Sequence, residues 1–346
     1  MTVTLAEVAQ ATGLSRSLVS LALRGDDGVS VPCRERVVRA ADELGLPVGA
    51  LARRRASGDP LVIGVLVTDA AHPFHAEVLA SARETAATFG FAVRVVDAGR
   101  DDARLAAGLE ALVASAGTAD GVLGVAVVSS RLPRARVVSA ARRVPVAVLG
   151  SGAGLLAGTG IDTVSVDEES GMRELLLYLA SLGHVRTCFV AESAFPSTTR
   201  RGRVHAEVSG RLQATADRCA ADIDVLVAEP GRVRSFLDAG VTAFVAANDA
   251  TAGRLLAAAR AAGIDLPEVA AVTGFDGTAL AERLDLTTVG QPCRRMGARV
   301  VELVVERLRG RRVVRHEVLP TVLVPRCRPR SVLPSASAVP SVSSGR

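Results

Sequence analysis

One helical segment near the N-terminus carries small polar and basic side chains along one side. At about 3.6 residues per turn, residues 15–24 separate into an apolar arc and a polar arc. The apolar arc, which would pack inward, consists of Leu18, Val19, Ala22 and Leu23. The polar arc follows the N-cap residue Ser15 and would remain accessible to a partner. It consists of Arg16, Ser17, Ser20 and Arg24. Arginine and hydroxyl side chains donate to base edges and phosphates, so this arc predicts contact with the major groove of DNA.

Leu21 lies at the edge of the polar arc, where a leucine has no core to fill. An apolar side chain in a major groove can contact the methyl group of thymine, so we expect Leu21 to take part in reading bases. The alternative for this segment is a plain helical cap whose polar face is only solvated. The pattern of the helix alone leaves both interpretations open.

A second set of side chains follows three apolar runs farther along the chain. They are Asp69, His72 and Phe74 after residues 61–68; Asn248 and Asp249 after residues 241–246; and Phe275 and Asp276 after residues 269–273. Open α/β sheets bind ligands at the carboxyl ends of their strands, so these groups predict a site for the hydroxyl, amide or amine groups of a small molecule. Each polar residue of the later two groups has a structural alternative as a helix cap.

Three short helices are predicted to carry the polar arc. Apolar residues recur at spacings of three and four over residues 5–11, 15–24 and 32–44. Gly13 lies in the turn between the first two, and Ser30 caps the third, which Gly45 ends. A second helix with an exposed face behind a glycine-containing turn is the helix-turn-helix arrangement. We therefore expect residues 1–46 to form a DNA-binding domain, followed by a basic linker at residues 47–60.

The rest of the chain alternates between apolar runs and amphipathic segments of helical length. Near-continuous apolar runs at residues 61–68, 91–97, 121–128 and 145–150 are typical of parallel strands buried on both faces. Further strands are predicted at residues 163–166, 185–191, 223–228, 241–246 and 269–273, then a helix at 294–309 and a strand through 313–324. The pattern predicts an α/β fold with two doubly wound parallel sheets over residues 61–330, and a disordered tail at residues 331–346.

Length and composition exclude several classes of protein. The chain of 346 residues, 49% hydrophobic and 22% charged, is typical of a soluble globular protein with more than one core. No apolar run reaches the length of a membrane span and no secretory signal opens the chain, so we expect a cytoplasmic protein without a membrane partner. The five cysteines are scattered without the spacing of a metal site, and we expect no metal or other cofactor. The net charge of +5 is compatible with a polyanionic partner without requiring one.

An enzymatic interpretation has one weak basis in the sequence. The run Gly152-x-Gly154-x-x-Ala157 follows a predicted strand and superficially fits a dinucleotide fingerprint. It follows the fourth strand, however, and does not open a helix. His72 and His75 have no marked third ligand for a metal. We therefore expect the protein not to be an enzyme.

Short ordered motifs run through almost the whole chain, from residue 3 to residue 331. They include Leu5-Ala6-Glu7-Val8-Ala9, Leu18-Val19-Ser20, Ala40-Ala41-Asp42-Glu43-Leu44-Gly45, Ala50-Leu51-Ala52-Arg53, His72-Pro73-Phe74, Ala247-Asn248-Asp249, Gly274-Phe275-Asp276 and Gln291-Pro292. Together they resemble the LacI/GalR family of transcriptional regulators. The resemblance implies a homodimer that reads a pseudo-palindromic double-stranded operator, usually as a repressor. It also implies a two-lobed, periplasmic-binding-protein-like domain in which a metabolite bound between the lobes controls DNA binding.

The resemblance further implies that residues about 50–57 form a hinge helix in the minor groove, presenting Leu51, Arg53, Arg54 and Arg55. The family commonly has a leucine, which wedges between base pairs, where this chain has Arg55. Our hypothesis is that Arg55 enters a narrowed minor groove and neutralises phosphates, with less kinking and a steeper salt dependence. Leu21 stands where the family often has an arginine that reads guanine, so the operator should differ from the common family palindrome.

For the effector, motif matching to the family implies contacts from Ser197, Thr199, Arg203, Asn248, Asp276 and Gln291. The family binds sugars, nucleobases and related metabolites, so we expect a sugar-like or nucleoside-like effector. With 3% aromatic residues and no tryptophan, a typical stacked hexose is less favoured. The competing interpretation is a cytoplasmic small-molecule-binding protein with a degenerate DNA head; a nucleotide-cofactor enzyme is a weaker alternative. The tail lacks leucine heptads, which favours a dimer over a tetramer.

Overall fold

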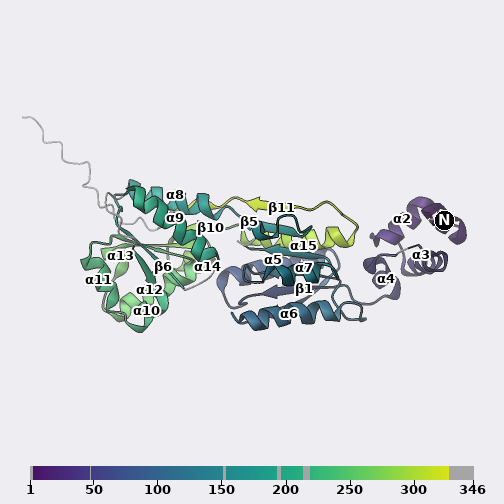
Figure 1. Ribbon diagram of the computed structural model, residues 1–346, viewed down its shortest axis with the longest axis horizontal. Helices are drawn as coiled ribbons and strands as arrows, with labels where there is room; N and C mark the ends of the chain where they lie inside the picture. Colours follow the sequence, from purple (N-terminus) through teal and green to yellow (C-terminus); the bar gives the residue numbers. More distant parts are fainter. Residues whose placement is uncertain (1–2, 47, 151–152, 193–195, 213–218, 327–346) are drawn as a thin grey trace, which may run out of the picture. The chain divides into compact units, whose positions relative to one another are not determined.

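The computed structural model describes residues 3–46, 48–150, 153–192, 196–212 and 219–326 (Figure 1). The chain divides into two compact units. Unit 1 comprises the chain up to residue 166 together with residues 292–319, and unit 2 comprises residues 167–291 together with the chain from residue 320 onward. Gly152, in the glycine-containing run after the fourth predicted strand, and the predicted tail at residues 331–346 lie outside the described residues.

Three helices open unit 1: α1 (Leu5–Thr12), α2 (Arg16–Arg24) and α3 (Val31–Leu44). The predicted cap at Ser15 is present, whereas Ser30 occupies the N-cap position of α3 without a side-chain cap hydrogen bond. Ser15 Oγ accepts a hydrogen bond from the Leu18 amide at 3.2 Å, and Gly13 and Gly25 end α1 and α2 with positive φ. Their buried core consists of Val8, Ala9, Val19, Ala22, Val37 and Ala41. Because α2 buries Val19 and Ala22, its opposite side is left free for contact with a partner.

Helix α4 (Ala50–Ser57) follows the three-helix head and precedes the first strand. It packs against α3 through Ala52 and Ala56, which share a small apolar cluster with Val38. Gly58 ends the helix in the left-handed conformation. The basic linker predicted at residues 47–60 therefore contains two turns of helix.

The main sheet of unit 1 has the strand order β11-β5-β4-β3-β1-β2, and every neighbouring pair in it is parallel. The strands are β1 (Val62–Val67), β2 (Ala92–Asp97), β3 (Gly124–Val128), β4 (Val146–Leu149), β5 (Asp162–Val166) and β11 (His316–Leu319). Helices α5 (Pro73–Thr88) and α15 (Cys293–Leu308) cover one face, and α6 (Asp102–Ser115) and α7 (Arg134–Ala141) cover the other. Figure 1 shows α6 on the opposite side of β1 from α5 and α15. A short 3-10 turn, η1 (Ala153–Leu156), precedes β5.

The sheet of unit 2 has the order β12-β10-β9-β8-β6-β7. Its strands are β6 (Thr187–Ala191), β7 (Ala220–Asp222), β8 (Ala243–Ala246), β9 (Ala271–Asp276), β10 (Thr287–Gly290) and β12 (Val322–Val324). All pairs are parallel except β10 with the edge strand β12. The α/β fold with two doubly wound, predominantly parallel sheets is confirmed. The segment predicted as one strand at residues 313–324 is instead two strands, one in each sheet.

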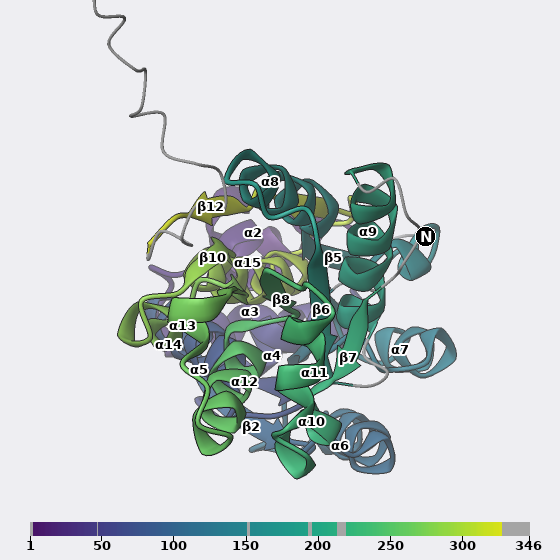
Figure 2. The same ribbon diagram turned by 90° about the vertical axis from the view of Figure 1, so that its left-hand side faces the viewer.

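Helices cover both faces of the unit 2 sheet. The helices α8 (Glu168–Ser181) and α9 (Pro196–Leu212) lie on one face. The other face carries α10 (Ile223–Ala228), α11 (Arg232–Asp238), α12 (Asp249–Ala261) and α13 (Leu266–Val269). Figure 2 shows α8 and α9 together, away from α10, α11 and α12. The short α14 (Ala279–Arg283) follows β9 and packs against α12.

The prediction of a strand at residues 223–228 is wrong, because this segment is helix α10. Asp222 caps it by accepting a hydrogen bond from the Asp224 amide at 2.8 Å. Ile223 and Leu226 are buried, whereas Val225 and Val227 are exposed. That three-residue spacing of buried side chains is helical, and the strand that precedes it, β7, is only three residues long.

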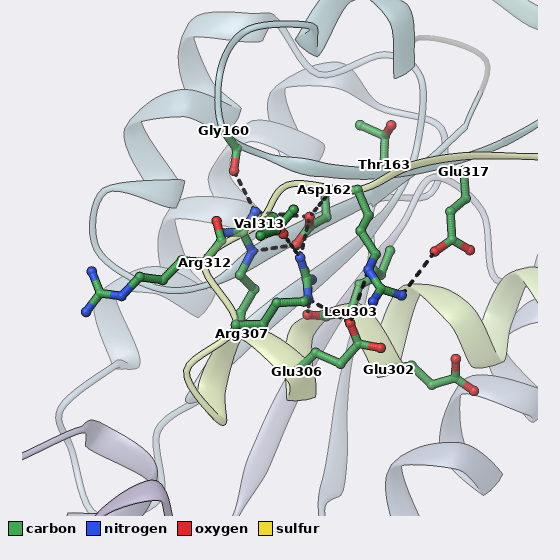
Figure 3. Close-up of polar contacts among 12 residues, drawn as sticks. Gly160, Asp162, Thr163, Glu302, Leu303, Glu306, Arg307, Arg312, Val313 and Glu317 are labelled. Atoms are coloured by element: carbon green, nitrogen blue, oxygen red, sulfur yellow. Dashed lines mark hydrogen bonds and ion pairs between the residues drawn. The ribbon is translucent and has the colours of Figure 1, made fainter.

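A network of charged side chains holds β11 and the end of α15 to β5 (Figure 3). Asp162, at the start of β5, has no exposed surface. Its carboxylate accepts hydrogen bonds from the guanidinium groups of Arg307 and Arg311 and from the backbone amide of Arg315. Burial alone would raise the pKa of Asp162, but the hydrogen bonds from Arg307 and Arg311 outweigh it and hold that pKa below its ordinary value.

Arg299 forms a second centre of the same network. It donates to Glu317 of β11 and, along α15, to Glu302 and Glu306. Three carboxylates around one guanidinium that is 5% exposed make a charge-assisted cluster of the kind that fixes geometry. The two centres attach the last elements of unit 1 to its sheet. In the described part of the chain, no helix is both long and apolar enough to cross a membrane.

Candidate functional site

The predicted recognition face of α2 is open in the structure. Ser15, Arg16, Ser17 and Arg24 are exposed, and Ser20 and Leu21 are partly exposed. Arg24 lies along the helix, donating to Ser20 Oγ at 3.0 Å and to the Asp26 carboxylate at 2.8 Å. Buried Arg34 stabilises the loop between α2 and α3 by donating hydrogen bonds to the carbonyls of Ala22 and Asp26. The face is thus a rigid, polar surface on a capped helix.

The three consecutive arginines of α4 have three different partners. Arg53 makes a bidentate ion pair with Asp42 of α3, at 2.9 and 2.6 Å. Arg55 pairs with Asp27, in the loop between α2 and α3, and Arg309 reaches the same carboxylate at 3.2 Å. The hydrogen bond from Arg55 lowers the pKa of Asp27 against the opposing effect of burial. Arg53 is 51% exposed and Arg55 is 13% exposed.

Arg54 and Leu51 lie on the buried side of α4. Leu51 is 1% exposed and belongs to the apolar core that also contains β1, α5 and α15 side chains. Arg54 is 7% exposed and donates to backbone carbonyls of Pro60, Thr118, Ala119 and Gly121. Of the hinge residues expected to face DNA, Arg53 is therefore half exposed and Arg55 partly accessible. Leu51 and Arg54 are enclosed by unit 1 itself.

Unit 2 has a cluster of buried polar groups where its strands end. Arg201 of α9, 4% exposed, donates to Glu168 of α8 at 2.8 Å and to the carbonyl of Ala247, just after β8, at 2.5 Å. Its guanidinium lies over the ring of Phe275, 3.7 Å from the centroid, and 3.6 Å from the Asp276 carboxylate. Arg201 thus joins the N-terminus of α8 to the ends of β8 and β9. A cation held between acidic groups and a ring face is suited to polar, hydroxyl-bearing ligands.

Asp276 ends β9 with φ of 110°, a value that non-glycine residues rarely adopt. Its carboxylate accepts a hydrogen bond from Gln291 Nε2 at 2.6 Å. Burial raises the pKa of Asp276 to about 8; the positive charge of Arg201 opposes that rise. Backbone strain and a perturbed carboxyl group at the end of a buried strand are features of functional sites.

The other strand-end groups of unit 2 have structural roles. Asn248 caps α12 by accepting a hydrogen bond from the Thr251 amide at 2.7 Å. Asp249 is buried and accepts from Thr278 and from the Thr288 hydroxyl. Burial raises the pKa of Asp249, and these hydrogen bonds oppose the rise. The side chain of Asn248 therefore forms the helix cap that the structural alternative predicted for it.

On α9 the structure distinguishes between two arginines two residues apart. Arg203, expected from the motif, is 69% exposed and pairs with Glu169 at 2.7 Å. Thr199 is also exposed, and the side chain of Ser197 lies outside the described residues. The motif did not point to Arg201 or Glu168. Helical spacing would have placed Arg201 on the buried side, because it lies three residues before Val204 and seven before Val208, both buried.

In unit 1, the predicted residues Asp69 and His72 lie in the loop between β1 and α5, and Phe74 lies in the first turn of α5. Asp69 accepts a hydrogen bond from the Ala71 amide at 3.0 Å, and His72 caps α5 by accepting from the Phe74 amide at 3.3 Å. Phe74 packs against the apolar core. His75 contacts the Asp69 carbonyl at 2.8 Å. Within the described ranges, no group of three or more His, Cys, Asp or Glu side chains is arranged to hold a metal ion.

Known proteins resemble this chain along almost its whole length, including both the head and the two α/β units. The matching family model describes a periplasmic binding protein-like domain over residues 176–327. The HTH-type transcriptional regulator Rv3575c of Mycobacterium tuberculosis is 30% identical over 355 aligned residues, covering 93% of this chain and 95% of that protein. The structure of the transcriptional regulator CelR with cellobiose is 27% identical with a TM-score of 0.61, covering 94% and 99% of the two chains. The lac repressor dimer bound to operator and the anti-inducer ONPF has the same fold, with a TM-score of 0.65 at 23% identity and coverage of 96% and 100%.

A three-helix head whose second helix has an open polar face, joined by α4 to two parallel α/β units, defines a DNA-binding regulator with a ligand-binding domain. Its relatives are transcriptional regulators, which are not enzymes. The chain belongs to the LacI/GalR family of transcriptional regulators.

Proposed function

We propose that this protein is a cytoplasmic, homodimeric regulator, acting as a repressor, whose two α2 helices read the half-sites of a pseudo-palindromic operator. The observation that carries the proposal is the accessible face of α2, which presents Arg16, Ser17, Ser20 and Leu21. The Ser15 cap and the hydrogen bond from Arg34 to the Ala22 carbonyl hold this helix in place. Side chains of this size let a helix lie deep in a major groove. The lac repressor supports the mode of assembly, because its operator complex is a dimer.

We further propose that the effector binds at the strand ends of unit 2, where Arg201, Asp276 and Gln291 contact it. Because the pKa of Asp276 is near 8, its carboxyl group is largely protonated at pH 7 and can donate as well as accept a hydrogen bond. Phe275 lies behind Arg201 and is fully buried, so it supports the guanidinium instead of stacking on a ligand ring. This favours a compact, hydroxyl-bearing effector, sugar-like or nucleoside-like. The CelR structure is a complex with cellobiose.

The test begins with selection of genomic fragments on the purified full-length protein at near-physiological salt. We expect enrichment of one pseudo-palindrome, and its release or tighter binding with one compound from a panel of sugars and nucleosides. The variant Arg201→Lys should weaken the response to that compound, and the matched control Arg203→Lys should not. Enrichment of no sequence would show that the head does not read DNA. The protein would then be a small-molecule-binding protein with a degenerate head.

A further inference from the structure

Two cysteine side chains lie next to each other on adjacent strands of unit 2. Phe189 of β6 pairs with Ala220 of β7. The residues immediately before them are Cys188 and Cys219, which are therefore neighbours across the two strands. Adjacent strands are about 4.8 Å apart, within the range of about 4.4–6.8 Å that separates the Cα atoms of disulfide-bonded residues. The backbone thus allows a disulfide bond between Cys188 and Cys219.

Both thiols are on the same face of the sheet. Cys188 belongs to the apolar cluster below α10 and α12, and Cys219 packs against that cluster, whereas Phe189 belongs to the cluster on the other face. The two thiols form a side-chain hydrogen bond, which together with burial raises the pKa of Cys188. Because a hydrogen bond that raises the pKa of a thiol favours its protonated form, Cys188 is the donor and the Cys219 sulfur is the acceptor.

The two cysteines differ in their access to solvent. Cys188 has no exposed surface, whereas Cys219 is partly exposed. The sulfur that is accessible and accepts a hydrogen bond is the one that an oxidant reaches first, and the buried thiol is positioned beside it to react second. Cys33, on α3 of unit 1, is also partly exposed and provides a comparison of similar accessibility.

We propose that Cys188 and Cys219 form an oxidation site, at which hydrogen peroxide converts the two thiols into a disulfide bond. The Cys219 sulfur attacks one peroxide oxygen, so that an S–O bond forms, the O–O bond breaks, and the first molecule of water leaves with the Cys219 proton. The Cys188 sulfur then attacks the Cys219 sulfenic acid. The S–S bond forms, the S–O bond breaks, and the hydroxide leaves with the Cys188 proton as the second molecule of water. The two sulfurs are oxidised and the peroxide is reduced.

The disulfide bond encloses the whole of α9. Strand β6 precedes this helix and β7 follows it, so the bond joins the chain before the helix to the chain after it. Strand β7 is three residues long and lies at the edge of the sheet, where its one neighbour is β6. Helix α9 carries Arg201, which pairs with Glu168 of α8. Oxidation therefore restricts local opening of the segment that holds Arg201.

The first arm of the test treats the reduced full-length protein with hydrogen peroxide, alkylates the remaining thiols under denaturing conditions and maps the cysteines by mass spectrometry. We expect a disulfide bond between Cys188 and Cys219 that dithiothreitol reverses, both in wild type and in the matched control Cys33→Ser. In Cys188→Ala, Cys219 should stop at the sulfenic acid and react with dimedone. A free thiol at Cys188 with Cys219 oxidised to a sulfinic or sulfonic acid, or joined to a different cysteine, would overturn the proposal.

The second arm compares amide hydrogen exchange of residues 196–212 in reduced and peroxide-treated wild type. We expect exchange about tenfold slower in the oxidised protein, because the bond holds the chain at both ends of α9. Peroxide should leave the exchange of Cys219→Ser unchanged. Equal exchange in the two redox states of wild type would overturn the inference that the bond restrains α9. This comparison uses the wild-type chain, so its outcome does not depend on the folding of a variant.

Discussion

Replacing Asp162 by asparagine should destabilise unit 1 far more than removal of an exposed ion pair. The carboxylate accepts five hydrogen bonds, from Arg307 Nε at 2.7 Å and Nη2 at 3.0 Å, Arg311 Nη1 at 3.1 Å and Nη2 at 2.7 Å, and the Arg315 amide at 2.7 Å (Figure 3). An asparagine offers one acceptor oxygen and directs an amide at a guanidinium. Breaking a buried pair costs about 3–5 kcal/mol. Because the side chains of Arg307 and Arg311 remain 19% and 13% exposed, we expect a loss of stability at the lower end of this range, about 3 kcal/mol.

The assay is native-state hydrogen exchange of β5 and β11, because the chain has no tryptophan and its single tyrosine, Tyr178, is in unit 2. A loss of about 3 kcal/mol predicts exchange roughly 100-fold faster in these strands. The control is Asp102→Asn, which removes the pair with Arg131 on an aspartate that is 62% exposed; an exposed pair is worth about 0.5 kcal/mol. Acceleration below tenfold, or equal to the control, would refute the reasoning.

The pH dependence of this effect has a definite sign. The pKa of Asp162 is lowered in the folded state, so its stabilising contribution is present above the unfolded value of about 3.9. The contribution is lost as the pH falls through the lower folded pKa. The difference between wild type and Asp162→Asn should therefore shrink in acid.

Three further predictions concern the proposed sites. Arg201→Lys should weaken binding of the compound that acts on the wild-type operator complex by about 30-fold, because charge-assisted contacts worth about 2 kcal/mol are lost. Calorimetry measures this affinity, and the control Arg203→Lys should bind the compound within twofold of wild type. In wild type, the stability of unit 2 should decline as the pH rises from about 4 to about 8, and Asp276→Asn should abolish this decline. With a pKa raised to about 8, folded Asp276 binds more protons than the unfolded chain in that window, so stability falls as pH rises. Tyr178 fluorescence during urea unfolding measures this, and parallel pH curves for the two proteins would contradict it. Arg55→Leu should reduce the salt slope of operator binding by about one, whereas Arg260→Leu, at an exposed position of α12, should leave it unchanged. Equal slopes for wild type and Arg55→Leu would exclude a phosphate contact by Arg55.

Local chemistry made the head and most strands predictable from the sequence. The residues that begin and end the head helices, Ser15, Gly13 and Gly25, act through hydrogen bonds and backbone angles within a few residues of their own position. The buried parallel strands are likewise signalled by runs of apolar residues, because both of their faces are covered. The segment at residues 223–228 has the composition of such a strand. It is helical because Asp222 caps it and one side of the turn packs on the core.

The tertiary structure alone decided what each charged side chain does. Arg53, Arg54 and Arg55 are identical in type and adjacent in sequence, and all three were predicted to face DNA. Arg54 meets three carbonyls from a turn more than sixty residues away, and Arg53 and Arg55 meet carboxylates of the head. Arg201 and Arg203 differ in the same way, one buried over Phe275 and the other at the surface. A guanidinium can be solvated, paired or buried, and its partners come from distant parts of the chain, so no spacing of neighbouring residues contains that information.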